Sequence, residues 1–321
     1  MSLFFKAILW LGLLAAILAL IGMLLVQIQI FSPLVRVYDN YPYLGDSIRA
    51  QALTPSPTTL ANILSIGIIF LISKIWIQGD RKLFYWIALI LMLLACFLTL
   101  SKGVLLLAAG ILFIFSRTPK LSSFLKKSFQ IGMFLFAAAY LFGTHFLVVD
   151  KNHPQLAEIK AAPFNTGEVI ASTKTKLFIP TAYTALKEAS LTIGNRNLLA
   201  GVGAGNHNLL VGQLKTEGLF PEQIPNFDPH STYFGGFAEL GLLGVASIAL
   251  IVVFISRMSF KLLKKYPSDY FTIALVSCLL VMSLEAIATD ILNFRHFWIL
   301  LAALGFLKYQ GDHNGLPAGI N

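Results

Sequence analysis

Two basic residues, Arg49 and Lys102, are of a type that could hold an anion, and both lie near long apolar blocks. The planar guanidinium of arginine binds phosphate oxygens through two N–H groups and keeps its charge at physiological pH. A cation at the end of an apolar block can also simply extend along it toward water, and this interpretation stays open, above all for Lys102. The two residues therefore predict an anion clamp, with a purely interfacial role as the alternative.

A histidine, His230, stands in the stretch DPHSTYFGG, directly before an apolar block that begins at residue 233. A neutral imidazole near pH 7 can accept a proton from a hydroxyl group, so His230 is a candidate general base. A lone histidine is more commonly an ordinary hydrogen-bonding residue. Its place at the mouth of the predicted helices favours a role in chemistry.

Other local patterns exclude several kinds of site. The glycine-rich stretch GVGAGN (201–206) follows no predicted strand, so it is not a nucleotide-binding loop; a tight turn is favoured over a phosphate cradle. The histidines and cysteines show no His-x-x-x-His or Cys-x-x-Cys spacing, and no Gly-x-Ser-x-Gly is present. The sequence therefore predicts neither a metal site nor a serine nucleophile.

Two acidic residues, Glu285 and Asp290, lie near the end of the apolar block 271–289. Charged side chains are costly inside a bilayer, so both are candidates for a polar or ion pathway. An ion pair between Asp290 and Arg295 is the alternative interpretation.

The elements that must position these residues are membrane helices. Hydrophobic residues make up 57% of the 321 positions, 12% are charged, and the mean hydropathy is +0.76, which excludes an ordinary soluble domain. A bilayer-spanning helix needs about 17 to 25 mostly apolar residues, and alternation typical of a porin strand is absent. We expect an all-α membrane protein with about eight transmembrane helices, at 3–30, 58–77, 83–100, 104–116, 129–149, 233–255, 271–289 and 294–309.

The net charge of +9 follows the topology of the predicted spans. With eight spans, thirteen basic residues fall on one side: Lys6, Lys74, Arg81, Lys82, Arg117, Lys120, Lys126, Lys127, Arg257, Lys261, Lys264, Lys265 and Lys308. The short connections on the other side hold four: Arg36, Arg49, Lys102 and Arg295. The positive-inside rule then places both termini in the cytoplasm, and the charge indicates no nucleic-acid surface.

The chain divides around one large polar segment, 150–231, which this topology places outside. The parts are a bundle at 1–149 with an external arginine-containing loop at 31–57, the external loop 150–231, the last spans at 232–309 and a short cytoplasmic tail at 310–321. Within the loop, residues 180–193 predict a short amphipathic helix that ends at Gly194. The first apolar block is expected to be a retained span rather than a cleaved signal peptide. Both cysteines, Cys96 and Cys278, fall inside predicted spans, so no external disulfide is expected.

Polar residues from distant parts of the chain are thereby predicted to share the external face. They are Arg36, Arg49, Lys102, Arg196, His207, Asp228, His230, Asp290 and Arg295.

Several stretches resemble motifs of the O-antigen ligase and polymerase family, in the order in which that family carries them. LLAGVGAG (198–205) is similar to the family's LLGVGxG, and His230 precedes FAELGLLG (237–244), which resembles the family's span beginning ExGxxG. LTLSKG (98–103) resembles LTxSRG, Arg49 followed by PTTLA (57–61) resembles an arginine followed by PNxxA, and 290–298 resembles a terminal RxxW segment. Ser231 and Lys102 replace the family's usual asparagine and arginine, and an alanine is inserted before Gly201.

The resemblance implies a metal-independent glycosyltransferase at the outer face of a bacterial inner (cytoplasmic) membrane. Its donor would be a glycan on undecaprenyl diphosphate, and its acceptor a sugar hydroxyl of a lipid A-core, a growing chain or a protein. His230 would orient or deprotonate the acceptor, and Arg49 would hold the diphosphate, helped by Lys102, Arg196, Lys176 or Arg295. Because the donor arrives activated, no cofactor is expected.

Two alternatives accompany this interpretation. A multi-pass solute or ion transporter could use Glu285, Asp290 and Arg295 along its path, although no inverted repeat or pair of broken helices is evident in the sequence. The chain could also be a non-catalytic subunit of an assembly.

Overall fold

The computed structural model describes most of the helical part of the chain. The described residues are 2–28, 30, 32–41, 45–101, 103–118, 127, 131, 147–150, 167–171, 175–180, 182–222 and 224–313. Lys102, most of the predicted span 129–149 and much of the predicted external loop 150–231 lie outside them.

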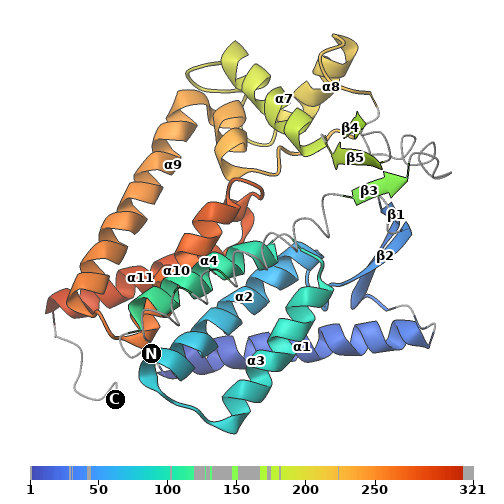
Figure 1. Ribbon diagram of the computed structural model, residues 1–321. Coiled ribbons are helices and arrows are strands. Elements are labelled where there is room, and N and C mark those ends of the chain that lie inside the picture. Colours follow the sequence, from blue (N-terminus) through green and yellow to red (C-terminus); the bar gives the residue numbers. More distant parts are fainter. Residues whose placement is uncertain are drawn as a thin grey trace.

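The described part of the chain is mostly helical (Figure 1). Its helices and helical turns are α1 (Ser2–Gln27), α2 (Pro57–Ser73) with a π-helical turn η1 (Lys74–Gln78), α3 (Leu83–Leu98), α4 (Gly103–Arg117), α7 (Ala182–Arg196), α8 (His207–Thr216), α9 (Thr232–Lys265), α10 (Tyr270–Glu285), a 3-10 turn η2 (Ile291–Asn293) and α11 (Arg295–His313). Seven of the eight predicted spans coincide with helices in this part. Among the described residues, three helices are long and apolar enough to cross a membrane, namely α1, α2 extended by η1, and α9.

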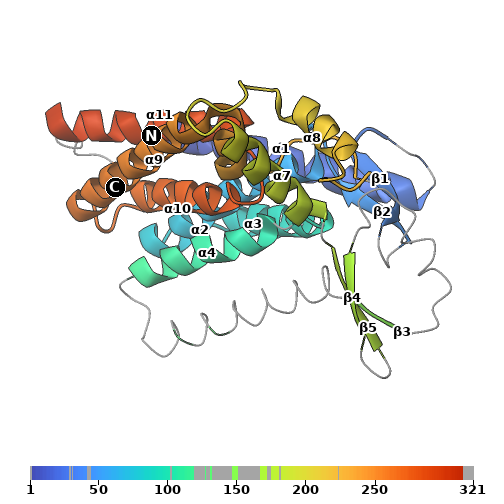
Figure 2. The ribbon, with the colours of Figure 1, turned by 90° about the horizontal axis from the view of Figure 1, so that it is seen from above.

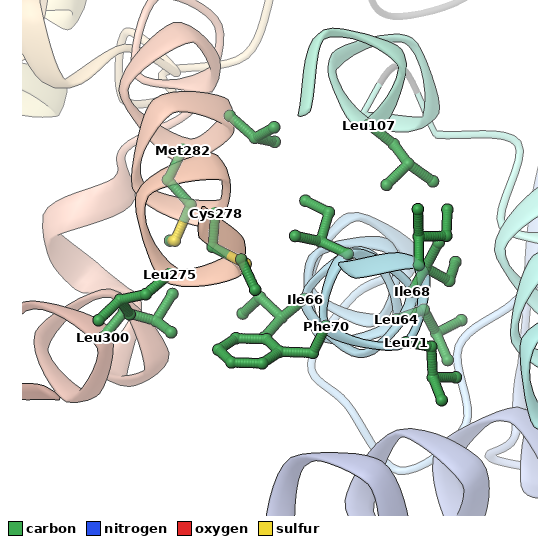
Figure 3. Close-up of a cluster of buried hydrophobic side chains, with 14 of the residues drawn as sticks. Leu64, Ile66, Ile68, Phe70, Leu71, Leu107, Leu275, Cys278, Met282 and Leu300 are labelled. Carbon is green, nitrogen blue, oxygen red and sulfur yellow. The ribbon is translucent and has the colours of Figure 1, made fainter. Parts of the chain in front are cut away.

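Helix α2 lies at the centre of the bundle, packed against α1, α3, α4 and α10. Leu64, Ile68 and Phe70 are fully buried there; Figure 3 shows Phe70 on the side of α2 that faces α10, and Leu64 and Ile68 on the opposite side. Pro57 occupies the first turn, where its missing N–H costs nothing, and Ser56 caps the helix by accepting a hydrogen bond from Thr59 N at 3.1 Å. Buried residues occur on every side of α2, which fits a helix that neighbours cover all round; most are apolar, and Asn62, Ser65 and Ser73 are buried polar exceptions.

Helix α9 has a break at Gly241, whose φ of 61° and ψ of −147° are not helical. The turn before α8 packs into this break: Leu242 N donates to Leu198 O at 2.8 Å. A Cβ on Gly241 would lie 2.6 Å from the same carbonyl, so glycine is required for this approach. The break therefore holds the α7–α8 region on the start of α9, and in the view from above α7 and α8 lie over the bundle (Figure 2).

Short strands depart from the all-α prediction. Strands β1 (Val35–Tyr41) and β2 (Gly45–Ala50) form an antiparallel ribbon inside the predicted loop 31–57. Strands β3 (Leu147–Asp150), β4 (Gly167–Ala171) and β5 (Thr175–Pro180) form a second sheet in the order β3-β5-β4. The last residues of the predicted span 129–149 thus belong to β3. Backbone outside a bundle needs hydrogen-bond partners, and strand pairing supplies them.

The prediction that Gly194 ends the loop helix was wrong. Helix α7 continues through Gly194 to Arg196. A Cβ at Gly194 would lie 2.5 Å from Cε1 of Phe237, so the glycine permits close packing of α7 on α9 rather than a helix cap. Leu186, Ile193 and Ala238 belong to the small core that joins these helices to α8.

Candidate functional site

His230 lies in a tight turn immediately before α9, with its side chain 38% exposed. Its φ of 44° is in the left-handed region, which costs a residue with a Cβ roughly 1–2 kcal/mol. Asp228 offsets this cost, because its Oδ1 accepts a hydrogen bond from His230 N at 3.3 Å. Backbone strain held in place by its surroundings is a common feature of functional sites.

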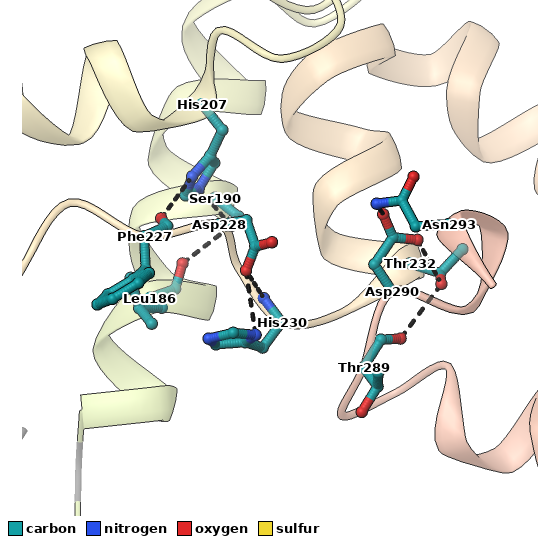
Figure 4. Close-up of polar contacts among 10 residues, drawn as sticks. All are labelled: Leu186, Ser190, His207, Phe227, Asp228, His230, Thr232, Thr289, Asp290 and Asn293. Carbon is teal, nitrogen blue, oxygen red and sulfur yellow. Dashed lines mark hydrogen bonds and ion pairs between the residues drawn. The ribbon is translucent and has the colours of Figure 1, made fainter. Parts of the chain in front are cut away.

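The same carboxylate oxygen of Asp228 lies 3.1 Å from Nδ1 of the His230 ring (Figure 4). An acidic partner at Nδ1 fixes the orientation of the ring. In the neutral imidazole it also favours the tautomer that carries its N–H proton on Nδ1. Nε2 is then the basic nitrogen of the ring. The Phe227 ring lies beside the imidazole, with centroids 6.1 Å apart. This arrangement suits a general base.

The residues after His230 are bonded to the connection between α10 and α11. Ser231 caps α9 through Phe234 N and donates to Ala286 O at 3.1 Å. Thr232 N donates to Ala286 O at 2.9 Å, and the Thr232 hydroxyl donates to Asp290 Oδ1 at 3.1 Å. The turn that carries His230 therefore has a fixed position relative to the end of α10.

Arg49 lies on strand β2, where its Nε donates to Thr99 O at 2.7 Å. Thr99 ends α3, and its hydroxyl accepts a hydrogen bond from Ser101 N at 3.2 Å. The half-buried guanidinium thus lies beside the turn between α3 and α4. The strand register pairs Arg36 directly with Arg49, which places both side chains on one face of the ribbon.

The end of α10 lies between these two groups of residues. Glu285 is 2% exposed, and its Oε1 lies 3.5 Å from the point where a Cβ of Gly103 would be. Its other carboxylate oxygen, Oε2, is buried with no hydrogen-bond partner among the described residues. The next residue, Ala286, accepts the hydrogen bonds of Ser231 and Thr232. Residues 285 and 286 thus contact the α3–α4 turn beside Arg49 on one side and the His230 turn on the other.

The remaining predicted site residues contact other parts of the structure than residues 285 and 286. Arg196 makes a two-pronged, exposed ion pair with Glu217, with 2.6 Å between Nη2 and Oε2; this pairing raises the pKa of Arg196 and lowers the pKa of Glu217. Lys176 lies in β5, opposite residues of β3 and β4, and Arg295 is the first residue of α11. Lys102 is outside the described residues.

Comparison with known protein families shows to which family the chain belongs. The family model described as O-antigen ligase matches residues 87–249, slightly more than half of the chain. The chain belongs to the O-antigen ligase family. The match includes Lys102, Lys176, Arg196 and His230, whereas Arg49 lies before it. No curated protein and no solved structure matches the chain.

Membership in the O-antigen ligase family, together with the apolar helices, identifies a membrane protein of polysaccharide biosynthesis. A glycosyltransferase-like ligase or polymerase function follows in general terms, and the transporter alternative is not favoured.

Three contacts in this family member were not predicted from its sequence. Asp228 was placed on the external face without its bonds to His230; the spacing of the two residues in DPH is the signal that could have found them. Arg36 lies opposite Arg49 because of a ribbon that was not expected. Asp290 accepts hydrogen bonds from Thr232 and Asn293, and the ion pair with Arg295 that was the alternative interpretation is absent among the described residues.

The glycine-rich stretch 201–206 is a turn, as favoured from its sequence. Gly201, Gly203 and Gly205 have φ of 64°, 90° and 79°. Val202 N and Gly203 N donate to Ala238 O and Glu239 O of α9, so these two N–H groups hold the turn on the helix rather than facing a phosphate.

A hollow of about 430 Å³ lies toward the other end of α9. It is lined by Leu250, Val253, Phe254, Arg257, Met258, Lys261 and Lys308. More than half of α9 separates it from His230, so it has no part in this site. Within the described ranges, His, Cys, Asp and Glu side chains form no group of three that could hold a metal ion.

Proposed function

We propose that this protein transfers a glycan from undecaprenyl diphosphate to a sugar hydroxyl at the outer face of the inner membrane. The observation that carries the proposal is the junction at residues 285–286, which ties an oriented histidine to a half-buried arginine. A base and a fixed cation held in one framework are what this reaction needs. The proposal includes about eight spans, both termini in the cytoplasm, and segment 150–231 outside.

In the proposed step the acceptor oxygen bonds to the anomeric carbon of the donor glycan, and the bond between that carbon and the diphosphate oxygen breaks. The acceptor proton passes to Nε2 of His230, and Asp228 stabilises the imidazolium that forms. Both electrons of the broken bond leave with the diphosphate. Negative charge develops on its oxygens, and a fixed guanidinium beside them lowers the barrier.

Arg49 is proposed as the cation that meets the diphosphate. Its Nε donates to Thr99 O at 2.7 Å, which fixes the guanidinium beside the turn between α3 and α4. Arg36, on the same face of the ribbon, could provide a second guanidinium for the second phosphate. Substrate contacts stay predictions for four further cations, Lys102, Arg196, Lys176 and Arg295. Arg196 is the weakest of these candidates, because it already forms an ion pair with Glu217. A diphosphate is already a good leaving group, so the proposal requires no metal or cofactor.

The test is release of undecaprenyl diphosphate from a lipid-linked oligosaccharide by the full chain in liposomes, with candidate acceptors. His230→Gln and Arg49→Gln are expected to lower the rate by roughly a hundredfold or more. Lys215→Gln, which removes a cation on α8, is the matched control and should turn over like the wild type. Wild-type turnover that survives His230→Gln would refute the proposed base. Absence of turnover across several donors and acceptors would refute the reaction.

A further inference from the structure

A second histidine, His207, lies at the first position of α8 and is 1% exposed. Its Nε2 lies 2.9 Å from Ser190 Oγ on α7, and its Nδ1 lies 3.2 Å from the carbonyl oxygen of Phe227 (Figure 4). Ser190 Oγ in turn lies 2.8 Å from Leu186 O. Three polar contacts therefore run in a line from α7 through the imidazole to the segment that carries His230.

The protons available to this line fix its arrangement. Both ends are carbonyl oxygens, which only accept, so three hydrogen bonds would need three protons. Burial lowers the pKa of His207, which keeps its ring neutral near pH 7. The neutral ring and the Ser190 hydroxyl together hold two protons. One of the three contacts is therefore not a hydrogen bond.

Two tautomers of His207 divide these protons differently. With the proton on Nε2, the lone pair of Nδ1 would face the Phe227 oxygen across 3.2 Å, which is repulsive. With the proton on Nδ1, the ring donates to Phe227 O and Nε2 accepts from Ser190. The second arrangement leaves Leu186 O to the hydrogen bonds of its own helix. Physical chemistry thus favours Nδ1–H on the side of the Phe227 carbonyl.

The Phe227 carbonyl and the backbone nitrogen of Asp228 share one peptide plane. A hydrogen bond that holds this carbonyl therefore also fixes the backbone position from which the Asp228 side chain extends. Asp228 then holds both the backbone and the ring of His230. We propose that His207, supported by Ser190, is a positioning residue whose Nδ1–H fixes the Phe227 carbonyl and so the turn that presents His230. The inference rests on the proposed function, in which His230 is the base.

The experiment uses the full chain in liposomes and a graded set of variants. His207→Leu removes the donor to Phe227. His207→Asn keeps an amide N–H close to the position of Nδ1, and Ser190→Ala removes the support at Nε2. Thr192→Ala is the matched control: Thr192 Oγ1 lies 3.0 Å from Glu188 O of the same helix, much as Ser190 Oγ lies 2.8 Å from Leu186 O, but it has no contact with His207 and lies on the solvent-facing side of α7.

Two quantities are measured for each variant. Amide hydrogen exchange of residues 227–231, followed by mass spectrometry without substrates, reports on the turn itself. Steady-state rates of undecaprenyl diphosphate release give kcat and KM separately. His207→Leu is expected to speed exchange in this turn and to lower kcat by roughly tenfold to a hundredfold, with KM within about twofold of wild type. His207→Asn should restore most of kcat, Ser190→Ala should fall between, and Thr192→Ala should match wild type.

The exchange measurement separates this inference from the reaction. If the wild type does not turn over but His207→Leu still speeds exchange at 227–231, the proposed function fails and the positioning contact stands. Wild-type exchange in both His207→Leu and Ser190→Ala would overturn the inference, whatever the turnover. A fall of His207→Asn to the level of His207→Leu would also overturn it, because the donor would then not be what matters. If His207→Leu does not fold, Ser190→Ala and His207→Asn decide the question by the same two measurements.

Discussion

Replacing Asp228 tests how His230 is oriented, and the structure sets the size of the effect. The carboxylate lies 3.1 Å from Nδ1, and two unit charges at that separation attract by about 1.3 kcal/mol in bulk water. The two side chains are 38% and 52% exposed, so water and salt screen the pair to roughly 0.2–1 kcal/mol. Asp228→Asn keeps an acceptor oxygen but loses the charge, so kcat should fall by no more than about fivefold.

Asp228→Ala removes the acceptor as well as the charge. His230 then loses the hydrogen bond that supports its left-handed backbone and the contact that orients its ring, each worth on the order of 1 kcal/mol. The expected loss in kcat is roughly ten- to thirtyfold.

The assay is the rate of undecaprenyl diphosphate release at saturating donor, for wild type, Asp228→Asn, Asp228→Ala and His230→Gln in parallel. The reasoning predicts four graded rates in that order. Equal, severe losses in Asp228→Asn and His230→Gln would show that the charge dominates, as in a fully buried pair. Wild-type rates in both Asp228 variants would show that the carboxylate does not orient the base.

Three further predictions concern other parts of the molecule. Arg49→Lys keeps the charge but loses the planar fork, so it should recover part of the rate lost in Arg49→Gln; equal rates for the two would argue against a bidentate contact. Gly194→Ala would place a Cβ 2.5 Å from Phe237 and should destabilise the fold by about 1–3 kcal/mol, seen as a lower thermal midpoint, whereas Gly305→Ala, with nothing within 4 Å, should not. Because the folded-state pKa of His207 is lowered, its contribution to stability is present above the unfolded pKa of about 6.5 and is lost as pH falls through the folded value. Asp228 and Glu239 interact electrostatically with this ring and are present in both proteins, so between pH 7.5 and pH 5.5 the thermal midpoint of wild type should fall further than that of His207→Asn; equal falls would contradict the assignment.

The helices of the bundle could be predicted from apolar blocks because the bilayer imposes their length. The segment 58–77 corresponds to α2 and η1, and the segment 233–255 falls within α9. Boundaries were less certain: Gly194 looks like a helix end in sequence, but its absent side chain serves a contact with Phe237 that only the tertiary structure defines. The ribbon of β1 and β2 was missed because its residues carry no clear alternation and lie in a polar loop.

The candidate site was predicted in its residue types but not in its contacts. His230 and Arg49 were singled out because a base and a cation at span ends suit transfer from a diphosphate. Asp228 was placed on the external face, but its hydrogen bonds to His230 were not predicted because they depend on the left-handed conformation of His230, which sequence does not reveal. The role of residues 285–286 as a junction depends on packing between distant helices.

The central claim is tested most directly by identifying the lipid product of a reaction with acceptor present. Mass spectrometry of the wild-type reaction should show undecaprenyl diphosphate appearing in equal amount to the transferred glycan, because the bond that breaks joins the anomeric carbon to the diphosphate oxygen. His230→Gln should form both products at least roughly a hundredfold more slowly. Undecaprenyl monophosphate as the lipid product, or diphosphate release at the wild-type rate in His230→Gln, would contradict the account.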